Sequence, residues 1–181
     1  MVNTGGNHGD LTDDYAAIRT EMEAVAAQFG KKVLREVPQH EVEENVGRLR
    51  RAVGDRAVLR ALHYYDENER VLEQVAAIKA GDLYRFFDSV KRSGDSSWKL
   101  LQNVYARPNE EQMAMGIELS RRFLGGDGAQ RVHGGGFAGT IQAYVPMGRL
   151  PAYIGMIEAA FGPGSCTPLM IRPEGAVMMP M

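Results

Sequence analysis

The residue pattern with the clearest chemical potential is a run of glycines, Gly134-Gly135-Gly136-Phe137-Ala138-Gly139. Closely spaced glycines present bare backbone amides and allow another backbone to come near, which suits contact with a phosphate or with another domain. Gly134, Gly136 and Gly139 also match the G-x-G-x-x-G pattern of dinucleotide-binding loops, with Glu158 about twenty residues further on. The alternative without a function is a wide, flexible hairpin.

The residues after this run argue against a dinucleotide site. Such a site needs a helix directly after the glycines, because the pyrophosphate rests on the amides of that helix's first turn. Here the glycines lead into Thr140-Ile141-Gln142-Ala143-Tyr144-Val145, which alternates with the period of a strand and ends at Pro146. We therefore expect a loop between two strands and reject the Rossmann interpretation.

The remaining reactive side chains form no recognisable site. The sequence contains no G-x-x-x-x-G-K-[ST] motif, and its four histidines show no H-x-x-x-H or H-E-x-x-H spacing. We expect His8 to serve loop polarity, His63 to be structural, and the single cysteine, Cys166, to lie in an apolar strand. One cysteine excludes an internal disulfide. We assign no catalytic and no metal-ligating residue.

The composition is that of a soluble globular domain. The 181 residues carry 21 Lys and Arg against 23 Asp and Glu, a net charge of −2, and 44% hydrophobic residues. These values exclude disorder, a collagen-like chain and a coiled-coil rod. The absence of a basic excess argues against a nucleic-acid partner, and no apolar stretch is long enough for a membrane span. Because the N-terminus has no signal-peptide pattern, we expect a cytoplasmic protein.

Helical periodicity dominates the first two thirds of the chain. We expect a helix capped by Asp10 and ended by Gly30, a short strand or extended link over 31–37, and a polar helix from Pro38 to about Arg51. The longest helix should run from about Asp55 to Ala80. A helix should follow Asp82 and break at Ser93-Gly94-Asp95, and Asp95 should cap a short turn after it. Another helix should begin at Pro108-Asn109 and end at Gly125-Gly126.

The last third changes character. We expect a strand over 128–133, the glycine loop, a strand over 140–145, a helix opened by Pro151 and closed by Gly162, and a third strand over Cys166–Ile171. Helices followed by neighbouring strands favour an α+β fold, in which an antiparallel sheet packs against helices on one face.

Several segments together resemble a known family. The opening Val2-Asn3-Thr4-Gly5-Gly6-Asn7-His8-Gly9-Asp10-Leu11-Thr12-Asp13-Asp14-Tyr15 resembles the start of the C-terminal half of galactokinases. Arg131-Val132-His133 with the glycine run resembles the third motif of the GHMP kinase superfamily. Phe161-Gly162-Pro163-Gly164-Ser165-Cys166 with Ile171-Arg172-Pro173 resembles the end of bacterial galactokinases, and Arg60-Ala61-Leu62-His63 with Glu67-Asn68-Glu69-Arg70-Val71 resembles their central helix. The likeness covers essentially the whole chain in the family's order.

The resemblance implies a fold and an activity. The fold would be the ferredoxin-like C-terminal domain of GHMP kinases, a single domain over 1–181 with a helical part at about 10–125 and a strand-rich part at about 126–175. The activity would be ATP- and magnesium-dependent phosphorylation of galactose at its anomeric hydroxyl. The exact sugar stays open, because most sugar-reading residues would belong to the other half.

The resemblance also carries over two sets of site residues. Tyr15 stands where galactokinases place a tyrosine that contacts the sugar, although it could instead head a buried stripe with Ile18 and Met22. Support of the nucleotide-phosphate loop would fall to Gly134, Gly135, Gly136, Phe137 and Gly139. The chain departs from the family at His133 and Ala138, where many members have Thr and Gly. Since alanine adopts a positive φ only at a cost, this loop could be less tight.

Key family motifs are missing. The sugar-binding G-R-x-N and G-E-H-x-D motifs, the phosphate loop P-x-x-x-G-L-S-S-S-A and the catalytic aspartate would belong upstream of Val2, and none occurs here. We therefore expect that the N-terminal catalytic domain is absent, that the chain alone is inactive, and that it binds neither ATP nor magnesium tightly.

The partner would then be that missing kinase domain or a separate subunit. The exposed interdomain face would favour a homo-oligomer, because large exposed apolar patches tend to self-associate. The alternative function is a non-catalytic small-molecule-binding or interaction domain, or one subunit of a split kinase.

Overall fold

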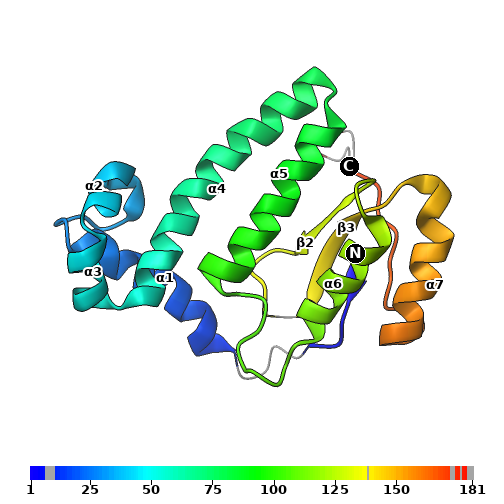
Figure 1. The fold of residues 1–181 in the computed structure, drawn as a ribbon, viewed down its shortest axis with the longest axis horizontal. Coiled ribbons are helices and arrows are strands. Elements are labelled where there is room, and N and C mark those ends of the chain that lie inside the picture. The colour runs from blue at the N-terminus through cyan, green and yellow to red at the C-terminus, as the bar shows by residue number, and fades with distance from the viewer. Residues whose placement is uncertain (7–10, 138, 172–173, 176, 179–181) are drawn as a thin grey trace.

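A computed structural model describes residues 1–6, 11–137, 139–171, 174–175 and 177–178. Helices account for most of the described residues, and a small sheet lies beside the last three helices (Figure 1). The α-helices are α1 (Thr12–Ala27), α2 (Gln39–Glu44), α3 (Val46–Val53), α4 (Asp55–Ala80), α5 (Leu83–Ser96), α6 (Gln112–Leu124) and α7 (Leu150–Phe161). Short 3-10 turns span Leu34–Glu36 and Met147–Arg149, and a π-helical turn spans Ser97–Leu101.

The sheet is antiparallel and has the order β1-β3-β2. Its strands are β1 (Val2–Asn3), β2 (Ala129–Val132) and β3 (Thr140–Tyr144). Ile141 pairs with Val2 on one side and with Val132 on the other, so these three side chains share one face and all are fully buried. Beyond β1, Cys166 forms a single antiparallel bridge with Val2. The mixed helix and antiparallel-sheet architecture expected from the sequence is therefore confirmed.

The apolar residues form two separate cores. The first packs the buried face of the sheet against Met113 and Ile117 of α6 and against Tyr153 and Ile157 of α7. The second contains no strand and joins α1, α3 and α4 through residues such as Val25, Leu49, Val58 and Ala61. Figure 1 shows α1 to α3 on one side and the sheet with α6 and α7 on the other, with the α4–α5 hairpin between them. The position of the glycine loop is therefore set by the first core and by the hairpin.

Contacts between the hairpin and the sheet explain one wrong prediction. Ser93-Gly94-Asp95 does not break the helix, because α5 continues through it to Ser96. Gly94 is buried against β2, and a Cβ at this position would lie 3.0 Å from Cβ of Arg131. Ser93 accepts a hydrogen bond from Arg131 and donates one to Glu67 of α4 at 2.6 Å. The small residues thus allow close packing of α5 on the strand.

Other boundaries differ from the sequence prediction. Residues 31–37 contain a 3-10 turn rather than a strand, and the polar helix after Pro38 is divided into α2 and α3. Asp95 does not cap a new turn, since the π-helical turn continues directly from α5. The helix expected from Pro108 begins only at Gln112. Cys166–Ile171 is no strand beyond the bridge at Cys166, and the third strand of the sheet is β1, which was not predicted.

The bounds of α4 and α7 and the start of α5 were predicted correctly. Gly81 ends α4 in the left-handed conformation, and the Asp82 carboxylate caps α5 by accepting from the Arg85 amide at 2.9 Å. Asp13 and Asp14 lie in the first turn of α1, where negative charge is favourable. The expected cap Asp10 lies outside the described residues. No helix in the described part of the chain is both long and apolar enough to cross a membrane.

Two helical glycines test the packing of α5. Gly94 has no room for a larger side chain, whereas a Cβ on Gly155 of α7 would have nothing within 4 Å. Gly94→Val should lower the free energy of unfolding by about 1–3 kcal/mol through overpacking. Gly155→Ala should raise it by about 0.5–1 kcal/mol through helix propensity. Urea denaturation measures both, and equal effects of the two substitutions would contradict the packing described for α5.

Candidate functional site

The glycine loop connects β2 to β3, as the sequence predicted. The His133 amide donates to the Thr140 carbonyl at 3.0 Å and closes the base of the loop. Three glycines have left-handed φ angles, 60° at Gly134 and 78° at both Gly136 and Gly139. Phe137 also has a positive φ of 52°, an unfavourable value for a residue with a side chain. The loop therefore has a specific conformation, which the surrounding contacts must maintain.

Asn103 provides most of those contacts. Its main-chain carbonyl accepts from the Phe137 amide at 2.7 Å, and its side-chain Nδ2 donates to the Gly135 carbonyl at 3.1 Å. Asn103 is fully buried, and its Oδ1 has no hydrogen-bond partner among the described residues. A Cβ on Gly136 would lie only 2.6 Å from the same Nδ2. The approach of Asn103 therefore requires glycine at position 136.

Tyr15 lies directly on this loop. Its hydroxyl donates to the Gly136 carbonyl at 2.7 Å, and its ring meets the Phe137 ring edge-on, with centroids 5.3 Å apart. Partial burial raises the pKa of the Tyr15 hydroxyl, so the phenol stays protonated at neutral pH and can donate. The structure thus brings together Tyr15 and the glycine loop, which are 121 residues apart in the sequence.

The N-terminal segment braces the far end of the loop. Both the amide and the hydroxyl of Thr4 donate to the Gly139 carbonyl, at 2.6 and 2.7 Å. A Cβ on Gly139 would lie 2.7 Å from Cα of Gly6, so glycine is required here as well. The glycine-bearing opening of the chain and the glycine loop are therefore neighbours. His8 and Ala138, which the sequence analysis considered, lie outside the described residues.

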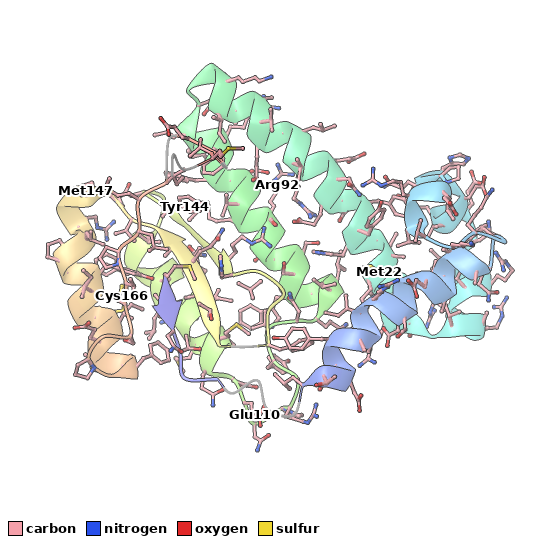
Figure 2. All side chains as sticks on the ribbon, turned by 180° about the vertical axis from the view of Figure 1, so that it is seen from behind. Met22, Arg92, Glu110, Tyr144, Met147 and Cys166 are labelled. Atoms are coloured by element: carbon pink, nitrogen blue, oxygen red, sulfur yellow. The ribbon has the colours of Figure 1, made fainter. Side chains whose placement is uncertain are left out.

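Two hollows adjoin the loop and share Phe137 and the segment 104–106 in their walls. The smaller, of about 160 Å³, is lined by backbone of Gly5, Gly6 and Gly139 and by Glu110. Glu110 projects from the end of the molecule farthest from the α4–α5 tip (Figure 2). The larger hollow, of about 430 Å³, contains cationic side chains. We name it the arginine cleft and define it by Asp14, Arg56, Arg60, Trp98, Lys99, Gln102, Val104, Tyr105, Ala106, Pro108 and Phe137.

The described residues offer no ready-made metal site, because no three His, Cys, Asp or Glu side chains gather among them. His63 instead bonds through Nδ1 to the Ser96 hydroxyl at 2.9 Å, and burial lowers its pKa. Cys166 is buried and its thiol pKa is raised by burial, which disfavours the reactive thiolate.

Sequence reasoning missed two members of the site. Asn103 belongs to an irregular segment, and nothing in its local pattern reveals a partner 32 residues away. Arg60 was noticed only as part of the family resemblance, although it is 2% exposed and lines the arginine cleft. A buried arginine in a helix of mixed polarity has no distinctive sequence signal, because its i, i+4 spacing from Arg56 equally suits a solvated face.

The loop makes a testable distinction between neighbouring glycines. Gly136→Ala introduces a Cβ into Asn103 and places a side chain at positive φ, whereas a Cβ on Gly134 meets nothing within 4 Å. Gly134→Ala should cost about 1–2 kcal/mol of unfolding free energy, the conformational term alone. Gly136→Ala should cost about 1–3 kcal/mol more through the overlap. Thermal and urea unfolding of both variants check this, and an equal cost would contradict the contact with Asn103.

Comparisons with known proteins were consistent with the resemblance. No protein-family model matches the chain. The galactokinase of Actinobacillus pleuropneumoniae serotype 5b is 33% identical over 150 residues, which cover 83% of this chain and 38% of that protein. The galactokinase of Haemophilus influenzae strain KW20 is 32% identical over 146 residues, 81% of this chain and 36% of the relative.

A solved structure has a similar fold. The crystal structure of Lactococcus lactis galactokinase complexed with galactose superposes with a TM-score of 0.72 at 20% identity, covering 88% of this chain and 40% of that one. The chain therefore spans less than half the length of the relatives it matches, which is consistent with a C-terminal half. Over 83% of its own length, the chain is homologous to the galactokinases.

Proposed function

We propose that residues 1–181 form the C-terminal part of a galactokinase-like, ATP-dependent sugar kinase and that they do not phosphorylate galactose by themselves. The observation that carries the proposal is the hydrogen bond from the Tyr15 hydroxyl to the Gly136 carbonyl. It joins the tyrosine that the resemblance assigns to the sugar with the loop that the resemblance assigns to nucleotide support. In a two-part kinase, such a contact would help to hold the sugar side and the nucleotide side in a fixed relation.

The proposed silence follows from the chemistry of phosphoryl transfer. The reaction depends on positioning and on stabilising the charge of the transferring group, through a phosphate-binding loop, cations and a base or orienting residue. The 181 residues contain neither the P-x-x-x-G-L-S-S-S-A loop nor the G-E-H-x-D motif. Tyr15 can orient a substrate hydroxyl but, as a protonated phenol, is a poor base at neutral pH.

The proposed fold is the ferredoxin-like domain of the GHMP kinases. The strand order β1-β3-β2, with Cys166 bridging to the free edge of β1, supports it. The Met1 carbonyl accepts from the Thr167 amide at 2.8 Å, so the segment after α7 continues the antiparallel pairing for a short distance. Cys166 would then mark a reduced fourth strand, and Gly134–Gly139 would support a phosphate loop of the other domain. A cytoplasmic location would suit the ATP donor.

A coupled assay with galactose, ATP and magnesium tests the function. The pure chain should show no turnover, whereas kinases typically reach about 1–100 per second. Adding the segment of the Actinobacillus galactokinase that precedes the matching region should produce phosphorylation, and Tyr15→Phe should reduce it. Turnover by the chain alone would refute the proposed silence. Binding of an unrelated small molecule, with no turnover in the mixture, would favour the alternative of a non-catalytic binding domain.

We also propose that the chain self-associates when it is alone. The distal half of α4 carries an apolar stripe of Val71, Leu72, Val75 and Ile78, which are 57, 72, 43 and 60% exposed. These residues lie at helical spacing and so form one face. We assign the stripe to the contact with a second copy, because burying it would remove apolar surface from water.

Light scattering at roughly 50 µM, where contacts of micromolar affinity are saturated, tests self-association. The unmodified chain should be a dimer or larger, and Leu72→Glu with Ile78→Glu should shift it to monomer. Met115→Glu is a matched control, since Met115 is 56% exposed on α6, outside the stripe. A monomeric unmodified chain, or equal dissociation by the control, would refute the assignment.

A further inference from the structure

The arginine cleft contains more positive than negative charge. Glu21 of α1 is the only carboxylate among the described residues that pairs with Arg56 and Arg60 of α4, and it serves both. Its Oε1 accepts from Arg56 Nε at 3.0 Å, and its Oε2 accepts from Arg60 Nη1 at 2.9 Å. Two guanidinium groups thus share a single hydrogen-bonded carboxylate, while Asp14 acts on both only through its charge.

The other charges of the cleft are already balanced. Asp14, the acidic residue in the wall, forms an ion pair with Arg107 at 3.0 Å, and Lys99 pairs with Asp95 at 2.9 Å. The local set therefore comprises four cations and three carboxylates, in a chain whose net charge is −2. The surplus positive charge lies at the two arginines, where the wall of the cleft is formed.

Arg60 is unusual because it is nearly inaccessible, with 2% exposure, and yet lines the cleft. Its Nε donates to the Leu101 carbonyl at 3.0 Å and its Nη1 to Glu21, while its Nη2 makes no hydrogen bond to the described part of the chain. Burial lowers the pKa of Arg60, consistent with a charge that its partners compensate incompletely. A guanidinium group with a spare donor favours an oxyanion such as a carboxylate or phosphate.

The volume of the arginine cleft and the side chains in its wall narrow the class of ligand that it could bind. About 430 Å³ is within the range of small-molecule sites, and Trp98, Tyr105 and Phe137 provide apolar surface beside the cations. A bare ion would leave much of this volume to water. We propose that the arginine cleft binds a small phosphate monoester, whose phosphoryl group rests on Arg56 and Arg60. The proposal goes beyond the proposed kinase function and does not require turnover.

The chain provides a local reporter for the test. Trp98 lines the cleft and is the one tryptophan in the sequence, so its fluorescence responds to binding there. Trp98 and Lys99 also line a neighbouring hollow of about 320 Å³ that contains Arg121 but neither Arg56 nor Arg60. Arg56→Gln and Arg121→Gln therefore remove the same charge from different hollows beside the same tryptophan. Both arginine side chains are more than half exposed, at 53 and 58%, so both variants should fold.

The experiment titrates the pure chain with galactose 1-phosphate, inorganic phosphate and galactose, each up to roughly 10 mM, a range that detects weak binding. We expect saturable fluorescence changes with the two phosphates and none with galactose. Arg56→Gln should weaken binding at least fivefold and Arg121→Gln should leave it unchanged. Tighter binding of galactose 1-phosphate than of phosphate would show that the apolar wall contacts the sugar, and equal binding would show recognition of the phosphoryl group alone.

Three results would overturn the proposal: no saturable change with either phosphate, an equal response to galactose, or weakening by Arg121→Gln but not by Arg56→Gln. Circular dichroism of both variants confirms that they are folded. The outcome is independent of the kinase assay, because a chain without turnover can still bind a phosphate monoester, and a chain with turnover can lack this site.

Discussion

The close approach of the backbone at Asn103 to the glycine loop is the constraint on which the rest of the site depends. It is possible only because position 136 has no Cβ, since such an atom would overlap the main-chain carbonyl oxygen of Asn103 and lie 2.6 Å from its side-chain Nδ2. The approach fixes the Gly135 carbonyl and the Phe137 amide, and these in turn hold Phe137 at its positive φ. The Tyr15 hydroxyl then donates to the Gly136 carbonyl, and its ring packs against the Phe137 ring.

Asn103 is itself positioned by the end of the α4–α5 hairpin. Gly94 and Ser93 bring α5 onto β2, and the π-helical turn Ser97–Leu101 follows without interruption. Gln102 then takes a left-handed φ of 58°, which turns the chain so that Asn103 meets the loop. The same turn presents the Leu101 carbonyl to Arg60. One irregular segment therefore supports both the glycine loop and the arginine cleft.

A structural feature could be predicted from the sequence where its cause lies within the same segment of the chain. Repeating apolar positions and a terminal glycine define α4 within the segment itself, and strand alternation after Gly139 was enough to reject a dinucleotide fold. Ser93-Gly94-Asp95 was misjudged because a local breaking tendency was outweighed by packing against β2. β1 is only two residues long, too short for a periodic pattern, and its existence depends on pairing with Ile141 far along the chain.

The site residues show the same division. The glycines were found from their own spacing and Tyr15 through the resemblance. Asn103 acts through its main-chain carbonyl, which any residue type possesses, and through a side-chain bond to Gly135 that no local pattern reveals. Arg56 and Arg60 look in the sequence like part of a solvated helix face, and only the packing of α1 and the segment after α5 turns that face into the wall of a cleft. Arg121 and Arg122 also share one glutamate, Glu118, but all three lie on α6. In the arginine cleft, by contrast, a different helix, α1, supplies one glutamate to two arginines of α4. An excess of this kind follows from the tertiary arrangement and has no counterpart in the net charge of the chain.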